Sequence, residues 1–322
     1  MRRFTSILDA ADPKALIAEA LQIKYHPYAR SELGKNRCLG LVFLNPSLRT
    51  RLSTQRAAQN VGLNTMVTNI DQEGWSLETR DIPMDGSKAE HIKEAAGVLG
   101  KYCDILGVRS FARLNSCVED EEEEVLKGMI RYSGVPVISL ESAFRHPLQS
   151  LADLMTIKEH ARSPQPKICL MWAPHIKPLP QAVANSFAEW VLAAGYSLTI
   201  AAPSGYELAP NFTAGATLVS SKAEGLDGAD FVYVKNWSKY EPYGQTSGAF
   251  ENWMITASDL SHFPKALFMH CLPVRRDVEL SSAVLDSRRS LVLEQAQNRI
   301  YSAQAVLTRV LSGLKNGDPS NS

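Results

Sequence analysis

The chain alternates short apolar runs with longer amphipathic segments, and this alternation constrains the fold more than any other feature. The apolar runs have the length and composition of strands, and the segments between them have helical periodicity. Strands that alternate with helices form parallel sheets covered by the helices. Strands are predicted at 38–44, 64–70, 104–109, 135–140, 167–173, 197–202, 230–235 and 266–271, and helices at 52–61, 90–101, 121–132, 148–161, 180–195 and 297–313.

The predicted strands fall into two sets of about four, which indicates an α/β protein with two doubly wound domains. At 322 residues the chain is too long for one ordinary core and suits two domains of about 150 residues each. We expect these domains at 1–147 and 148–296, with a bridging helix from Leu148. The C-terminal helix 297–315 is expected to pack on the first domain, and the tail 316–322 to be disordered.

Charge and composition exclude several classes of protein. The 34 basic and 34 acidic residues cancel and no basic stripe is present, so a nucleic-acid partner is not expected. No run approaches the roughly 18 apolar residues of a membrane span, and the N-terminus lacks the apolar core of a signal peptide. Five widely spaced cysteines without a Cys-x-x-Cys pair argue against disulfides and a zinc site. The sequence predicts a soluble cytoplasmic protein without a metal and without a membrane partner.

The segment 43–51 joins a predicted strand to the helix that follows it, and carries two hydroxyls and two guanidiniums. A strand-to-helix turn points backbone N–H groups and the positive end of the helix dipole into one crevice. Hydroxyls and arginines add donors there, and those from arginine are charge-assisted. The segment is predicted to hold a dianion the size of phosphate; the alternative is a solvated, capped helix start.

Further polar clusters follow other predicted strands at their carboxyl ends, where α/β sheets bind ligands. Arg109 and the segment 141–149 lie in the first half of the chain, and His175, Lys235 and the segment 270–276 in the second. Neither a Gly-x-Gly-x-x-Gly fingerprint, a Walker loop nor a nucleophile elbow occurs. This inventory suits a reaction that holds a phosphorylated electrophile beside an amine.

Several motifs together carry a resemblance to a known family. They are Ser47-Leu48-Arg49-Thr50-Arg51, His146-Pro147-Leu148-Gln149 and His270-Cys271-Leu272-Pro273-Val274-Arg275-Arg276, followed by Glu294 and Asn298-Arg299. In this order, over essentially the whole chain, they resemble the carbamoyltransferase family. The resemblance is greatest to its transcarbamylases of N-acylated ornithine, which also share the proline-rich loop 174–180.

The resemblance implies a two-domain doubly wound fold, a homotrimer with active sites at subunit interfaces, and no cofactor. It also implies that the second domain is knotted at the proline-rich loop. One substrate would be carbamoyl phosphate, and the other an N-acylated ornithine. By resemblance, carbamoyl phosphate would be held by Ser47, Leu48, Arg49, Thr50, Arg109, His146, Gln149, Cys271, Leu272, Arg275 and Arg299.

Trp75 would join that pocket from the long loop 71–88 of a neighbouring subunit. Thr50, Arg109, His146 and Cys271 would be the catalytic residues. The first three are donors for the carbamoyl oxygen, which gains negative charge when the amine attacks. The departing phosphate can take the amine proton, so no strong side-chain base is required.

Structural alternatives remain for several of these residues. His146 is alternatively a plain helix N-terminal residue, Cys271 a buried small apolar residue and Trp75 an anchor for its own loop. Arg275 and Arg276 are adjacent, so only one is expected to point inward, and the resemblance assigns that place to Arg275. For Arg51 the alternative is a structural salt bridge.

Lys235 indicates which amine is carbamoylated. The ornithine enzymes of the family follow the corresponding strand with an aspartate and a Ser-Met-Gly loop, both missing here. A lysine repels an α-ammonium group by roughly one to several kcal/mol at about 4 Å. An acylated α-amine is neutral, so Lys235 can bind the α-carboxylate beside it, unless it only lines a solvated rim. By resemblance, Glu141 and His175 also line the acylornithine pocket.

Ala89 indicates which acyl group the ornithine substrate carries. By resemblance it stands where N-acetylornithine enzymes carry a glutamate and succinyl-specific relatives an uncharged proline. A glutamate would repel a succinyl carboxylate, whereas Ala89 leaves room, with Lys88 and Arg80 nearby. The sequence favours N-succinyl-L-ornithine over N-acetyl-L-ornithine, with N-succinyl-L-citrulline, an arginine-biosynthesis intermediate, as the product. The remaining alternatives are a carbamoyl phosphate-binding relative without turnover and an α/β protein for another phosphate ligand.

Overall fold

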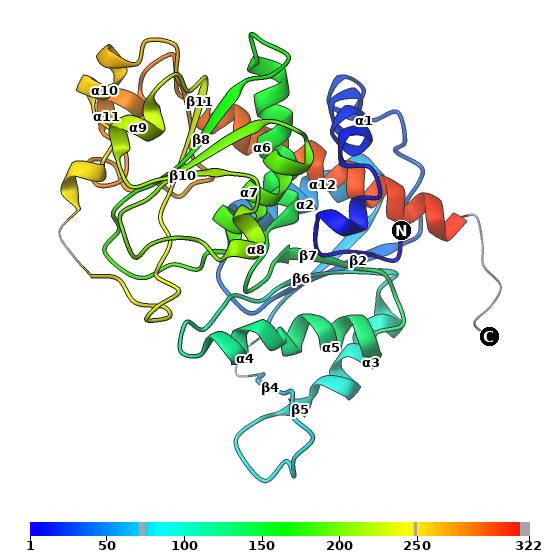
Figure 1. The fold of residues 1–322 in the computed structure, drawn as a ribbon. Helices are drawn as coiled ribbons and strands as arrows, with labels where there is room; N and C mark the ends of the chain where they lie inside the picture. The colour runs from blue at the N-terminus through cyan, green and yellow to red at the C-terminus, as the bar shows by residue number, and fades with distance from the viewer. Residues whose placement is uncertain (71–74, 248–249, 316–322) are drawn as a thin grey trace. The chain divides into compact units, whose positions relative to one another are not determined.

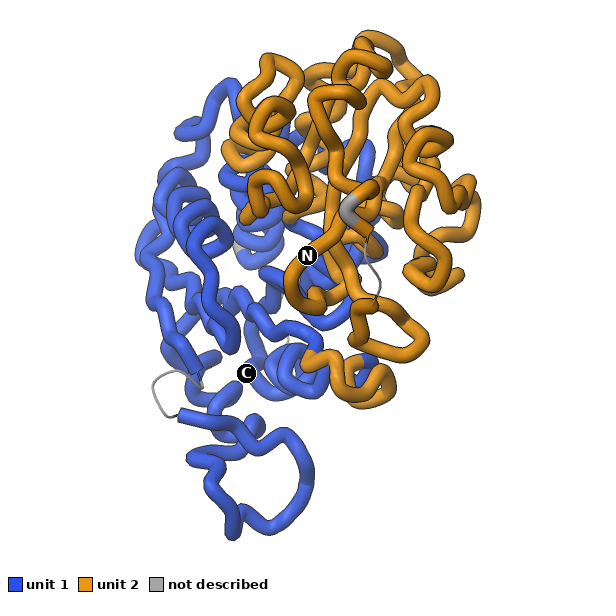
Figure 2. The backbone as a smooth tube through the Cα atoms, turned by 90° about the vertical axis from the view of Figure 1, so that its left-hand side faces the viewer, with its two compact units in different colours: residues 1–112, 121–148, 299–322 blue, residues 113–120, 149–298 orange. Residues whose placement is uncertain are grey.

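The structure, a computed structural model, describes residues 1–70, 75–247 and 250–315. The chain divides into two compact units (Figures 1 and 2). Unit 1 comprises 1–112, 121–148 and the chain from 299, and unit 2 comprises 113–120 and 149–298. The tail expected to be disordered, and residues 71–74 of the predicted long loop, lie outside the described residues.

Within the described residues, unit 1 is built on a five-stranded parallel sheet in the order β1-β7-β6-β2-β3. The middle strands are buried along most of their length, as in a sheet covered on both faces, while the edge strand β3 alternates between exposed and half-buried residues. The strands are β1 Arg3–Phe4, β2 Cys38–Phe43, β3 Asn64–Asn69, β6 Ile105–Arg109 and β7 Val137–Glu141.

Two helices of unit 1, α3 and α5, pack on this sheet through an apolar cluster that includes Val42, Leu106 and Met129. Their approach is close, because a Cβ atom at Gly100 would lie 1.8 Å from the Ser133 carbonyl oxygen. The other described helices of unit 1 begin or end in it. The bounds are η1 Ile7–Ala10, α1 Pro13–Tyr25, α2 Arg49–Asn60, α3 Ile92–Tyr102, α4 Cys117–Glu122, α5 Glu124–Tyr132, α6 Pro147–His160 and α12 Val292–Lys315.

The helix predicted at 121–132 is confirmed as α5 from Glu124 onward, but its first two residues belong to a separate helix, α4. Glu123, between the two helices, adopts a left-handed backbone conformation with φ of 43°. Asp120 in α4 is buried, and its carboxylate accepts the backbone N–H groups of Arg113 and Leu114 at 2.8 and 2.9 Å. These bonds tie α4 to the segment before it, so it does not continue into α5.

Unit 2 contains a second five-stranded parallel sheet among its described residues, in the order β10-β9-β8-β11-β12. Its helix α7 is apolar on most of its surface and is buried accordingly. Two parallel sheets confirm the predicted α/β class. The bounds are β8 Lys167–Trp172, α7 Ala182–Ala193, β9 Ser197–Ala201, α8 Pro210–Thr213, β10 Thr217–Val219, α9 Lys222–Leu226, β11 Phe231–Lys235, η2 Glu251–Trp253, α10 Ala257–His262, β12 Leu267–Met269 and α11 Ser282–Leu285.

The strand order reverses once in each sheet, and these points position the predicted polar residues. In unit 1 the reversal lies between β2 and β6, where Phe43 is in register with Arg109. In unit 2 it lies between β8 and β11, where Trp172 is in register with Lys235. Parallel sheets bind ligands at the carboxyl ends of strands beside such a reversal.

A small two-stranded parallel sheet, β4 Leu77–Glu78 with β5 Glu90–His91, lies apart from the main sheet of unit 1. The segment between its strands projects from unit 1 as an open loop (Figures 1 and 2). Across the part of the chain that the structure describes, a helix long and apolar enough to span a bilayer is not found.

Candidate active site

Two arginines converge on one threonine at the start of α2. Thr50 is buried in the first turn of that helix, and its Oγ1 accepts hydrogen bonds from Arg109 Nη1 and Arg299 Nη2, both at 2.8 Å. Arg109 ends β6 and Arg299 lies in α12, so three distant parts of the sequence meet here. Two buried guanidiniums beside a helix N-terminus create a positive site suited to an anion.

Glu141 lies against this positive site. Its Oε2 is 2.9 Å from Arg109 Nη1 and 3.6 Å from His146 Nε2. The register explains the first contact, because Arg109 and Glu141 are paired at the carboxyl ends of β6 and β7. The structure thus places Glu141, predicted to line the acylornithine pocket, beside residues predicted to hold carbamoyl phosphate. One carboxylate against two guanidiniums leaves the cluster with a net positive charge.

His146 is fully buried just before α6, and its imidazole is neutral. Burial lowers the pKa of His146 well below its usual value, and the positive charges of Arg299 and Arg109 lower it further. A neutral imidazole can still donate one N–H to an oxygen that becomes negative. Its environment therefore suits the predicted role of a hydrogen-bond donor and does not suit that of a cation.

The loop between β2 and α2 is attached to the end of β6. Asn45 Oδ1 accepts the backbone N–H of Phe111 at 2.8 Å, and the Phe111 ring stacks on the Arg109 guanidinium at 4.4 Å. Ser47 and Arg49 are half-buried, whereas the Leu48 side chain is 65% exposed in the single chain.

Arg51 is held against its own β-sheet. Its guanidinium donates to the Asn69 side chain and lies 5.1 Å from the Phe43 ring centroid. These contacts make Arg51 a structural residue that joins α2 to β2 and β3.

In unit 2, Gln149 is oriented by a carboxylate that the sequence analysis missed. Gln149 Nε2 donates to Asp153 Oδ1 at 2.7 Å, and Gln295 Nε2 donates to the same oxygen at 2.6 Å. All three side chains are buried. Asp153 could have been found from the sequence, because it lies four residues after Gln149 on one helix face. Gln295 has no comparable local signature.

The other residues predicted in unit 2 form a second cluster. His175, Lys235 and Arg275 lie together with His270 around the buried carboxylate of Glu279, which the sequence analysis also missed. Glu279 lies in an irregular segment, where no periodic pattern marks a buried residue. Cys271 and Leu272 lie after His270 in the segment that follows β12. They are half-buried, so Cys271 is not a buried small apolar residue.

Arg276 turns away from the residues around Glu279. Its guanidinium makes two hydrogen bonds to Asp286, at 2.7 and 2.9 Å, and both side chains are exposed. Arg275 instead donates through Nε to His175 Nε2 at 3.3 Å. Only one of these adjacent arginines contacts the predicted site residues, and it is the one that the resemblance indicates.

Trp75 and Ala89 lie just before the two strands of the small sheet, β4 and β5. Trp75 is 53% exposed, and its Nε1 donates to Glu90 Oε2 at 2.9 Å. Ala89 precedes Glu90, is exposed, and donates its backbone N–H to Ser76 O at 2.9 Å. The structure therefore brings these two predicted site residues close to each other, on a segment open to contact from outside the chain.

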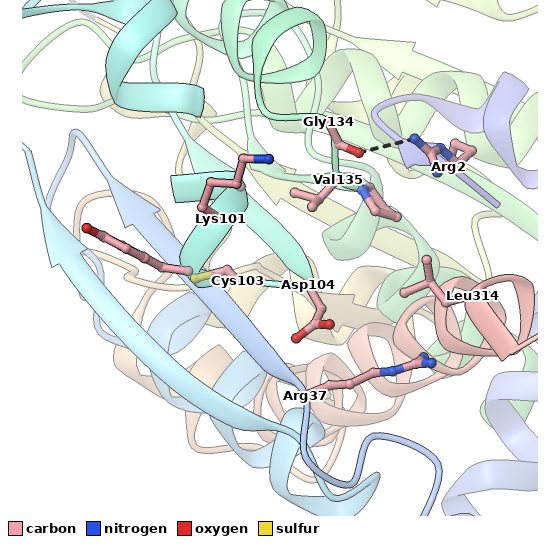
Figure 3. Close-up of a pocket in the computed structure, with 11 residues that line it drawn as sticks. Arg2, Arg37, Lys101, Cys103, Asp104, Gly134, Val135 and Leu314 are labelled. Carbon is pink, nitrogen blue, oxygen red and sulfur yellow. Dashed lines mark hydrogen bonds between the residues drawn. The ribbon is translucent and has the colours of Figure 1, made fainter. Parts of the chain in front are cut away.

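A cavity of about 310 Å³ in unit 1 lies at the amino ends of the strands, opposite the carboxyl ends where the predicted site residues stand. It is lined by residues that precede β2, β6 and β7, including Arg37, Asp104 and Gly134, and Figure 3 shows Arg2 donating to Gly134 O. The helices α3, α5 and α12 end nearby, so its basic residues face the partial negative charge of helix C-termini. This cavity does not include the predicted site residues.

No group of three or more His, Cys, Asp or Glu side chains is placed to bind a metal ion in residues 1–70, 75–247 and 250–315.

The family comparisons match both halves of the chain. The profile of the aspartate/ornithine carbamoyltransferase carbamoyl-P binding domain matches residues 2–159, and that of the Asp/Orn binding domain matches residues 179–310. An N-succinylornithine carbamoyltransferase of Bacteroides thetaiotaomicron is 48% identical, over 98% of this chain and 100% of that protein. An N-acetylornithine carbamoyltransferase of Xanthomonas campestris is 32% identical, over 94% of each.

A solved structure of the same fold is that of an N-acetyl-L-ornithine transcarbamylase variant in which one glutamate is replaced by alanine. That variant is complexed with carbamyl phosphate and N-succinyl-L-norvaline. It superposes with a TM-score of 0.90 at 31% identity, over 96% of this chain and 100% of the other. With two family profiles and full-length relatives in agreement, the protein belongs to the aspartate/ornithine carbamoyltransferase family.

Proposed function

We propose that the protein transfers the carbamoyl group of carbamoyl phosphate to the side-chain amine of N-succinyl-L-ornithine. The products are N-succinyl-L-citrulline and phosphate, as in arginine biosynthesis. The observation that carries this proposal is the convergence of Arg109 and Arg299 on Thr50 at the start of α2, in a chain of this family. Two buried cations at a helix N-terminus match the charge of a carbamoyl phosphate dianion.

The reaction requires donors for the carbamoyl oxygen. When the neutral amine attacks the carbamoyl carbon, a C–N bond forms and the oxygen gains negative charge. Arg109, Thr50 and the neutral His146 supply donors for it, in a buried site where such bonds are strong. The carbon–oxygen bond to phosphate then breaks, and the phosphate takes the proton that the amine loses.

Unit 2 has the charge required by an acylated ornithine. Lys235 and Arg275 are cations, Glu279 is an anion, and burial lowers the pKa of His175, so the cluster carries a net positive charge. Such a cluster attracts an α-carboxylate and disfavours a free α-ammonium. Gln149, Cys271 and Leu272 keep the carbamoyl phosphate roles that the resemblance assigns to them.

Two findings favour the succinyl group. Relatives named N-succinylornithine carbamoyltransferase are 47 and 48% identical to this chain, against 31 and 32% for those named N-acetylornithine carbamoyltransferase. An acetylornithine enzyme from which one glutamate was removed was solved with N-succinyl-L-norvaline bound. The uncharged Ala89 likewise places no negative charge where it would repel a succinyl carboxylate.

A substrate panel tests the function. The purified protein is incubated with carbamoyl phosphate and, in turn, N-succinylornithine, N-acetylornithine, ornithine and aspartate, and the ureido product is quantified. We expect kcat/KM to be highest for the succinyl derivative, by at least tenfold over the acetyl derivative. Phosphate release without a ureido product, or no turnover of any amine, would contradict a transferase.

We also propose a homotrimer in which Trp75 of one subunit completes the carbamoyl phosphate site of its neighbour. Support comes from the exposed Trp75, which precedes β4, and from the loop that projects between β4 and β5. Mixed trimers of Trp75→Ala and Arg109→Ala subunits should regain part of the parent activity, because some sites then lack both defects. Mixed trimers as inactive as either variant alone would place Trp75 outside its neighbour's site.

Further features follow from the family. We propose that both domains are doubly wound and that unit 2 is knotted at the proline-rich loop 174–180. In support of the knot, this loop is tightly held by the segment after β11. The backbone N–H and Oγ of Ser238 both donate to Leu179 O at 2.9 Å, and Gln181 Nε2 donates to Ser238 O at 2.8 Å. A cytoplasmic location and a reaction without cofactor are part of the same proposal.

A further inference from the structure

Glu279 is the most deeply buried charged group of the cluster that contains His175, Lys235 and Arg275. Its side chain is 2% exposed, and its Oε2 lies 2.6 Å from His270 Nε2. On the other side, its Oε1 is 3.5 Å from His175 Nε2. A carboxylate at this depth is stable only if its neighbours compensate its charge.

Those neighbours keep Glu279 ionised. Burial raises the pKa of Glu279, but the close contact with His270 and the positive charge of Lys235 outweigh that effect, so the pKa is lowered overall. Lys235 is itself buried, and its Nζ donates to Asn236 O at 2.8 Å. The negative charge of Glu279 thus offsets the positive charge of a buried lysine.

The contact with His270 fixes the proton on that ring. The backbone N–H of Leu272 donates to His270 Nδ1 at 2.9 Å, so Nδ1 is an acceptor. The proton must then be on Nε2, which faces Glu279 Oε2 at 2.6 Å. Through one imidazole, Glu279 thus orients the backbone of Leu272, which has a left-handed φ of 55° and belongs to the Cys271–Leu272 segment proposed to bind carbamoyl phosphate.

The other side of Glu279 faces the residues proposed for the acylornithine. His175 receives the Nε–H of Arg275 at 3.3 Å, and its Nδ1 lies 3.0 Å from Lys177 O. Lys235 lies close enough to His175 and Glu279 for its positive charge to contribute to the lowered pKa of each. One carboxylate therefore adjoins two sets of groups that serve two different substrates.

We propose that Glu279 is a positioning residue that couples the binding of the two substrates within unit 2. Through His270 it holds the Cys271–Leu272 backbone, and beside His175 and Lys235 it holds the groups that take the acylornithine carboxylate. When one substrate orders the groups that bind it, the shared Glu279 carboxylate favours the arrangement of the groups that bind the other substrate. The inference deepens the proposed function and rests on it.

The test compares two variants. Glu279→Gln keeps the shape of the side chain and removes its charge, whereas Glu279→Asp keeps the charge on a side chain that is one methylene shorter. The probe is N-succinyl-L-norvaline, which lacks the reacting amine, and its Kd is measured by calorimetry with and without carbamoyl phosphate. In the parent, carbamoyl phosphate should tighten its binding at least fivefold. In both variants that ratio should fall to near one.

The change in KM separates positioning from a general loss of structure. Loss of folded protein lowers kcat and leaves both KM values unchanged, whereas a displaced Cys271–Leu272 backbone and a displaced His175 weaken the binding of both substrates. KM for carbamoyl phosphate and KM for N-succinylornithine should each rise at least tenfold in Glu279→Gln.

Asp286→Asn is the matched control. Asp286 is an exposed carboxylate that lies close to Glu279 in the sequence, and its side chain pairs with the exposed Arg276. It should leave the coupling ratio and both KM values unchanged. If the parent does not turn over N-succinylornithine, the proposed function fails. If the parent is active and Glu279→Gln keeps its coupling ratio and its KM values, the inference about Glu279 fails. Should Glu279→Gln not fold, an intact coupling ratio in Glu279→Asp contradicts the inference equally.

Discussion

Replacing Arg109 with alanine is expected to lower kcat/KM for carbamoyl phosphate at least a hundredfold. A charge-assisted hydrogen bond contributes about 1.5–3 kcal/mol, and the guanidinium can make two such bonds to a dianion and its carbamoyl oxygen. The substitution also removes the ion pair between Arg109 and the buried Glu141, so less positive charge would face the dianion beside that carboxylate. Steady-state kinetics with carbamoyl phosphate as the varied substrate measure the effect.

Two further variants make this expectation specific. Arg109→Lys keeps the charge but loses the planar fork that contacts both Thr50 and Glu141, so its kcat/KM should lie between those of the parent and Arg109→Ala. Arg56→Ala, which removes an exposed arginine hydrogen-bonded to Tyr28, should behave like the parent. If Arg109→Ala stays within threefold of the parent, Arg109 does not bind carbamoyl phosphate.

Replacing Ala89 with glutamate is expected to shift the preference from N-succinylornithine toward N-acetylornithine by at least tenfold. Two like charges at 4 Å repel by about 1 kcal/mol in water and about 4 kcal/mol at an effective dielectric constant of 20. Ala89 is exposed in the single chain, which by itself gives the lower value. Contact with a neighbouring subunit, as proposed, would shield the site and raise the repulsion. The measurement is the ratio of kcat/KM values for the two substrates.

Ala89→Gln is the matched control for this prediction, because glutamine has nearly the volume of glutamate without its charge. If charge is the selector, Ala89→Gln should lower activity on the two substrates by similar factors and leave their ratio close to that of the parent. If Ala89→Glu also lowers both activities equally, or the parent already prefers N-acetylornithine, then Ala89 does not select the acyl group.

The class of fold could be predicted because parallel strands covered on both faces appear as continuous apolar runs. The predicted runs at 38–44, 104–109 and 230–235 correspond to the buried strands β2, β6 and β11. The short strands β1 and β10 were not predicted, because two or three residues at a sheet edge leave no detectable pattern.

The sequence by itself also determined which residues follow each strand, and therefore that Thr50, Arg109 and Lys235 stand at carboxyl ends. Only the tertiary structure decided their partners. Glu141 faces Arg109 because β6 and β7 are neighbours in register, although the two residues are far apart in the sequence. Glu279 was invisible because a carboxylate in an irregular segment becomes buried only when His175 and His270 surround it. Periodicity reports the face of an element, whereas charge compensation depends on groups that the chain brings together from far apart.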